Sequence, residues 1–270
     1  MTGGTRSPSP AIEAVAVFRA IVFAAVAAGL AAGIAVSALQ TVTTSPLILA
    51  AERYEQRAAT SPAHAQEPAR SLPALDAAAP KAGAAPAAGE PWAPADGIER
   101  IGYTTFANVL AGTGFALILT ACFALAGGAV DGRRGMLWGA AGFAVFTLAP
   151  ALGLPPELPG TAAADLAGRQ LWWLTAAAGT AVGLWLLVFR RGATAKVLGL
   201  VALALPHLAG PPPAHQLTHA VPAELAAHFA AASIVTAAVF WILLGWLAGT
   251  FYARLRPMSA AAPSAQAATS

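Results

Sequence analysis

The stretch FAAASIVTAAVFWILLGWLAGTF, residues 229–251, decides the fold class of this chain. It contains no charged residue and no proline. As a helix rising 1.5 Å per residue, it is long enough to cross the hydrocarbon core of a bilayer, which is about 30 Å thick. The stretch therefore predicts a transmembrane helix.

The composition of the whole chain agrees with this. Of its 270 residues, 57% are hydrophobic and only 10% are charged, against about 25% in a soluble domain. Mean hydropathy is +0.65. The net charge of +3 does not indicate nucleic-acid binding, because the basic residues form short clusters beside apolar segments rather than a basic face. The single cysteine, Cys122, excludes an intrachain disulfide and a thiolate metal cluster.

Apolar segments recur along the chain and predict an all-α, polytopic membrane helical bundle. Their ranges are 15–39, 103–130, 135–152, 171–189, 197–209 and 229–251. The first is too long for the apolar core of a signal peptide and predicts a retained anchor. The fifth reaches only about 20 Å as a helix, short of a full bilayer core.

Basic clusters help to decide whether this fifth segment crosses. They lie at Arg6, at Arg133 and Arg134, at Arg190, Arg191 and Lys196, and at Arg254 and Arg256. If all six segments cross, these clusters fall on one side, which the positive-inside rule makes cytoplasmic. We therefore expect six transmembrane helices, with five as the alternative. The protein is expected to be a multi-pass membrane protein in contact with lipid.

The domain organisation follows from these segments. Residues 1–14 form an N-terminal tail, 15–256 the membrane domain and 257–270 a C-terminal tail without structure. An Ala- and Pro-rich loop at about 60–94 interrupts the membrane domain and lacks the apolar content to fold. His64 lies in this loop and is expected to be an ordinary solvated side chain.

Small residues and tryptophans suggest how the helices are arranged. Glycines four residues apart occur at 29 and 33, 135 and 139, 179 and 183, and 245 and 249. Such spacing lets helices approach closely in lipid, and we favour general packing over a dedicated dimer interface. Trp172 and Trp173 open the fourth span and predict anchoring at the outer interface.

Catalytic motifs are lacking. The sequence contains no P-loop and no H-E-x-x-H pattern. Inside the predicted spans acids are nearly absent, and Asn108 is the clearest polar side chain there. The chain is therefore not expected to be an enzyme.

Histidines concentrate in one place. Four of the five, His207, His215, His219 and His228, lie in a Pro-rich stretch between the last two apolar segments. Imidazole is the commonest side-chain ligand for borderline divalent metals. We expect at least two of the four to bind a metal ion at the outer side, with a hairpin bringing His207 and His228 close. The alternative is a set of interfacial polar residues without a ligand role.

Three acids are candidate further ligands. Glu224 follows Pro222 at an expected helix start, where its negative charge interacts favourably with the helix dipole. It also lies one turn before His228, at i and i+4, so the two side chains share a helix face. Glu157 and Asp165 lie in the preceding outer loop and are surface acids or additional ligands. No cofactor is expected to be bound permanently.

Several stretches carry a family resemblance. GFAVFTLAPALGLPPELPGTAAADLAGRQLWWL (142–174), SPLILAAERYE (45–55) and LALPHLAGPPPAHQLTHAVPAELAAHFAAAS (203–233) resemble the CbtA family of probable cobalt transporter subunits. The PPELPG run corresponds to Pro155–Gly160, the D-x-x-x-R-Q-x-W-W run to Asp165–Trp173, and the PH pair to Pro206 and His207. The family is described with about five spans, whereas the charge pattern here favours six.

The resemblance implies a permease for Co2+ in the inner membrane of bacteria that make cobalamin. It also implies a small one-span, His-bearing partner called CbtB. Nitrogen and oxygen ligands suit Ni2+ as well. We therefore expect a membrane permease subunit that captures Co2+ (or Ni2+), as the transported ion, at an outward-facing His/carboxylate site. Both a single copy and a homo-oligomer are compatible with this expectation. The alternative is a non-transporting scaffold that assembles a partner permease.

Overall fold

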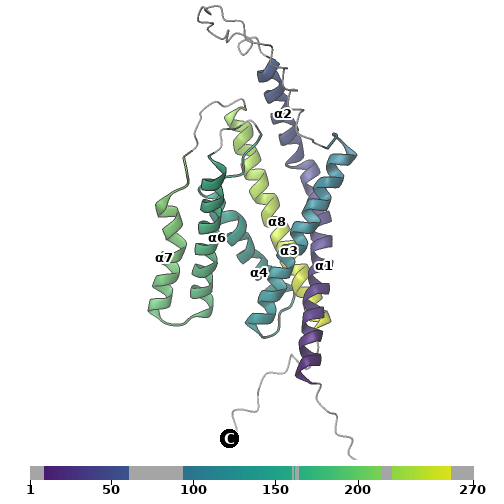
Figure 1. Cartoon of the computed structure of the whole chain (residues 1–270), viewed down its shortest axis with the longest axis vertical. Helices are drawn as coiled ribbons and strands as arrows, with labels where there is room; N and C mark the ends of the chain where they lie inside the picture. Colours follow the sequence, from purple (N-terminus) through teal and green to yellow (C-terminus); the bar gives the residue numbers. More distant parts are fainter. Residues whose placement is uncertain (1–8, 61–93, 160, 162–163, 214–220, 257–270) are drawn as a thin grey trace, which may run out of the picture.

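The computed structural model describes residues 9–60, 94–159, 161, 164–213 and 221–256. Within these residues the secondary structure is helical and contains no strand, so the predicted all-α membrane bundle is confirmed (Figure 1). Its elements are α1 (Pro10–Val42), α2 (Ser45–Thr60), α3 (Ile98–Ala126), α4 (Gly132–Phe143), the π-helix η1 (Ala144–Leu148), α5 (Ala149–Ala151), α6 (Leu166–Phe189), α7 (Ala193–Ala209) and α8 (Ala223–Leu255).

The chain passes back and forth through α1, α3, the α4–η1–α5 segment, α6, α7 and α8 (Figure 1). Of these, α1, α3, α6 and α8 are individually long and apolar enough to cross a bilayer. The start of α1 and the end of α8 lie at the same end of the bundle, opposite α2 (Figure 1). This arrangement agrees with six passes rather than five.

Glycine-lined crossings hold the helices together. On α1, Gly29 and Gly33 face the α3 backbone at Thr113 and Val109. The other glycine pairs predicted from the sequence also pack inside the chain: 135 and 139 of α4 lie against 245 and 249 of α8, and 179 and 183 of α6 lie against α7. General packing is therefore the observed role of these glycines.

The third pass contains an irregularity that hydropathy does not predict. In η1 the amide of Ala149 donates to the carbonyl of Ala144, which is a π-type bond. Pro150 follows directly and has no amide hydrogen to donate to the preceding turn. The widened turn is held by Trp241 of α8, whose Nε1 donates to the Thr147 hydroxyl at 3.1 Å.

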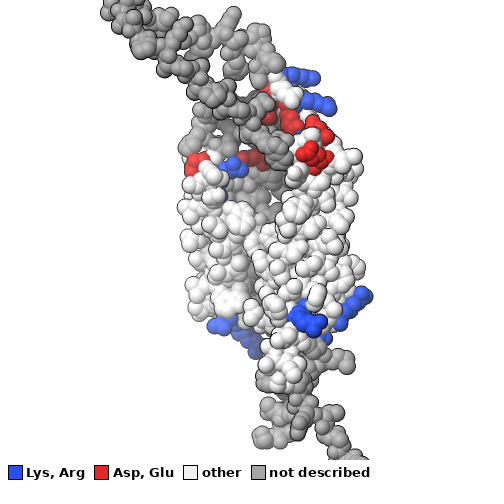
Figure 2. Space-filling model, turned by 45° about the vertical axis from the view of Figure 1, so that its right-hand side comes forward, with Lys and Arg blue, Asp and Glu red and all other residues white. Residues whose placement is uncertain are grey.

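Charge divides the bundle into two ends (Figure 2). The basic end carries the Lys and Arg side chains at 19, 133, 134, 190, 191, 196, 254 and 256, together with Glu13 and Asp131. The acidic end carries the acids at 52, 55, 96, 99, 157, 165 and 224, interspersed with arginines at 53, 57, 100 and 169. This separation reproduces the charge pattern on which the six-pass prediction was based.

Two features differ from the sequence expectations. Helix α2 follows α1 after a short break and extends the acidic end, in a region not predicted to be helical. Trp172 was expected at the lipid interface, but only 5% of it is exposed. The predicted tail 257–270, most of the loop 60–94, His64, His215 and His219 lie outside the described residues.

Candidate metal-capture site

A small apolar cluster assembles the acidic end. Ala51 of α2, Leu158 of the α5–α6 connection, and Val221 and Phe229 at the start of α8 are buried against one another. The cluster fixes the segments that carry Glu157, Glu224 and His228 relative to one another, because each segment contributes an apolar anchor to it.

His207 lies in the last turn of α7 and is half-buried. Its ring contacts that of Trp172 on α6 edge-to-face, with centroids 5.6 Å apart and planes at 74°. Trp172 in turn donates from Nε1 to the carbonyl oxygen of Pro150 at 3.0 Å. Trp172 therefore links α7, which carries His207, to α5, which carries Pro150.

His228 occupies the second turn of α8. Glu224 precedes it by one turn in the first turn of the helix, so both side chains share a face, and both are exposed. The helix start predicted at Pro222 is confirmed, since α8 begins at Ala223 with Pro222 as its N-cap. The pair offers a carboxylate and an imidazole to solvent at the acidic end.

The other two predicted acids already have protein partners. Glu157 forms an ion pair with Arg169 at 3.2 Å. Asp165 caps α6 by accepting the amide of Gly168 at 2.8 Å. A metal ion would have to compete with these partners for either carboxylate.

The described residues do not bring these ligands together around one point. No group of three or more His, Cys, Asp or Glu side chains suited to a metal ion is found among them. Helix α7, which carries His207, packs along α6 and makes at most marginal contact with α8, which carries His228. His215 and His219 belong to residues 214–220, outside the described part, so the four-histidine site stays a prediction.

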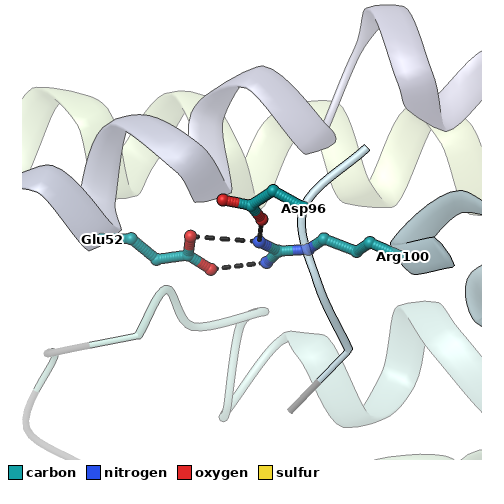
Figure 3. Close-up of polar contacts among 3 residues, drawn as sticks. All are labelled: Glu52, Asp96 and Arg100. Atoms are coloured by element: carbon teal, nitrogen blue, oxygen red, sulfur yellow. Dashed lines mark hydrogen bonds and ion pairs between the residues drawn. The ribbon is translucent and has the colours of Figure 1, made fainter. Parts of the chain in front are cut away.

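The structure also reveals a polar cluster that the sequence did not predict (Figure 3). Arg100 of α3 binds both carboxylate oxygens of Glu52 on α2, at 2.5 and 3.1 Å, and Asp96 at 3.0 Å. This clamp joins α2 to the start of α3. Two signals in the sequence could have suggested it: the i, i+4 spacing of Asp96 and Arg100, and the charged ERYE run (52–55), which is also part of the family resemblance.

Within the spans, uncharged polar groups pair with one another. The Asn108 amide of α3 donates to Ser37 Oγ at 2.9 Å and to Gln40 Oε1 at 2.7 Å, both on α1. The buried polar residues of the described chain are otherwise threonines. These groups serve helix association rather than a charged relay.

A comparison with protein-family models finds one match. Residues 18–253, nearly the whole chain, match the family described as "Probable cobalt transporter subunit (CbtA)". No curated protein and no solved structure matches the chain.

Proposed function

The chain belongs to the CbtA family of probable cobalt transporter subunits, and from this premise we propose that it captures Co2+ at the acidic end for uptake across the membrane. The metal would be cargo rather than a resident cofactor. Ni2+ is a second cargo with the same ligand preferences. We further propose a bacterial inner-membrane location and a role in supplying cobalamin synthesis, both implied by the family.

The observation that carries this proposal is the separation of charge. The short basic clusters lie at one end, which the positive-inside rule places in the cytoplasm. His207, His228 and the three candidate acids lie at the opposite end, which then faces outward. An outward acidic surface also raises the local concentration of divalent cations.

We propose that His207 and His228 contribute ligands, completed by His215 and His219 from the connecting loop. Glu224 is the favoured carboxylate because it is exposed on the same helix face as His228. To bind the ion, Glu157 has to break its ion pair with Arg169. Asp165 has to give up the hydrogen bond by which it caps α6.

A second candidate function is a scaffold that assembles a partner permease, such as a one-span CbtB-type subunit. The uncharged interior of the described helices favours it, because a divalent ion crossing this bundle would meet hydroxyls and amides but no ionised ligand. In this alternative, the chain does not transport the ion itself, and the partner permease that it assembles provides the path.

Cobalt uptake by cells and by reconstituted vesicles containing this chain alone tests the proposal. Uptake by the chain alone supports transport, whereas uptake only with a partner supports the scaffold. A variant with His207, His215, His219 and His228 all changed to Ala should lose cobalt uptake at normal membrane abundance. The matched control is H64A, which we expect to behave as wild type. Normal uptake by the quadruple variant would show that the histidines are not ligands.

A further inference from the structure

Trp172 is the ring neighbour that the structure gives His207. Centroid separations of about 4.5–7 Å with tilted planes are the favourable geometry for aromatic pairs, and this pair has 5.6 Å and 74°. Helix α7 packs mainly on α6. The His207 ring near the C-terminal end of α7 therefore contacts an α6 side chain, and that side chain is Trp172.

The indole is itself firmly held. Trp172 is 5% exposed, and its Nε1 donates to Pro150 O at 3.0 Å. Gly153 lies so close to the six-membered ring that an added Cβ would overlap Cζ2 and approach Cε2 to 2.7 Å. The end of the third pass therefore fixes the indole from two directions.

The helix that carries His207 is also held in place beside this indole. Gly179 of α6 lies against Pro206, where an added Cβ would come 2.9 Å from Pro206 Cγ. With the α7 backbone held at Pro206 and the indole held at Pro150, the remaining freedom of the imidazole is rotation about its own side-chain bonds. Contact with a rigid ring restricts that rotation.

We infer that Trp172 is a positioning residue that pre-orients His207 for metal capture. The inference rests on the proposed function, in which His207 is a ligand. Partners that orient a metal-binding histidine typically contribute about 10- to 100-fold in metal affinity. We expect the lower part of this range, because the contact is between rings rather than a hydrogen bond.

A double-mutant cycle on the full chain tests the inference, using CoCl2 binding to purified protein and the kinetics of cobalt uptake. Trp172→Phe should weaken cobalt binding and raise the uptake KM by about tenfold, with the maximal rate little changed. In a His207→Ala background the same substitution should change neither quantity further. Trp173→Phe is the matched control, because Trp173 stacks on Phe146 instead and is 39% exposed. If Trp172→Phe does not accumulate in the membrane, Trp172→Tyr replaces it in the cycle.

The results of the cycle decide whether Trp172 positions His207. Coupling between the two substitutions supports positioning, while effects that multiply independently, or that equal those of Trp173→Phe, overturn it. If His207→Ala binds cobalt normally but the quadruple histidine variant does not, the inference fails and the proposed function stands. If the quadruple variant also binds and transports cobalt normally, both fail.

Discussion

The α4–α8 crossing gives the sharpest test of the architecture, through Gly245→Ala. A Cβ at this position would overlap the carbonyl oxygen of Gly135 and lie 2.8 Å from Gly139 Cα and 2.9 Å from Gly139 N. All of these atoms are backbone, so no side chain can rotate away to make room. The two helices would have to separate.

The size of this effect follows from the contact distances. Carbon atoms in ordinary contact lie about 3.5–4.0 Å apart, so the helices must separate by about 1 Å, and a gap of that size forfeits up to roughly half of each dispersion contact. Overpacking of this kind costs about 1–3 kcal/mol. We expect the upper part of the range, because the clash is with backbone on a long crossing.

Unfolding of the purified protein in detergent, followed by circular dichroism, measures this loss. The control is Gly114→Ala on α3, where an added Cβ meets nothing within 4 Å. That substitution should be neutral or stabilising by up to about 1 kcal/mol, because alanine is the better helix former. If Gly245→Ala is no less stable than Gly114→Ala, the α4–α8 packing described above is wrong.

Other predictions address topology, the long loop, the interior and pH. A reporter fused after Arg256 should behave as cytoplasmic and one inserted near Ala214 as periplasmic; a cytoplasmic signal at Ala214 would contradict the outward-facing site. Deleting residues 61–91 should leave membrane insertion and cobalt uptake largely intact, so loss of uptake at normal abundance would assign that loop a function. Asn108→Leu removes two hydrogen bonds to α1 and should lower stability by about 1 kcal/mol, at roughly 0.6 kcal/mol for each bond between membrane helices, without changing cobalt affinity. A large affinity change would place Asn108 on the ion path. Cobalt binding should weaken when the solution is made acidic, because an imidazole must be neutral to coordinate a metal ion, and binding that does not change on acidification would argue against histidine ligands.

The positions of the spans could be predicted because they depend only on the order of apolar and charged residues along the chain. Each pass needs a long apolar run, and charged residues mark where the run must end. Arg190 and Arg191 follow the end of α6 in this way, and Arg256 follows the end of α8. The fifth segment, predicted at 197–209, is the apolar helix α7 (Ala193–Ala209), and its crossing stays a prediction from the parity of the basic clusters.

The contacts between particular helices could not be predicted from the sequence. The glycine spacing on α4 gives no sign that its partner is α8 rather than a second copy of the chain. Likewise a tryptophan at the end of a span is usually an interfacial anchor, but Trp172 is buried because Pro150 and Gly153 provide an acceptor and a flat surface for it. Helix α2 was missed because it is amphipathic: Leu47, Ile48 and Ala51 form an apolar face, but the polar residues of the other face lower its average hydropathy below that of a span.

The contacts at the acidic end narrow the search for ligands. Among the residues that carry the family resemblance, Leu158 is a core anchor, Glu157 is paired with Arg169, and Asp165 caps a helix. These residues thus have structural roles that account for their presence without any metal. His207, His228 and Glu224 have no such explanation in the described structure beyond the ring contact and the helix start. Substitution of these three should therefore affect cobalt affinity directly, whereas substitution of Glu157 or Asp165 should act first on the stability of the outer loop.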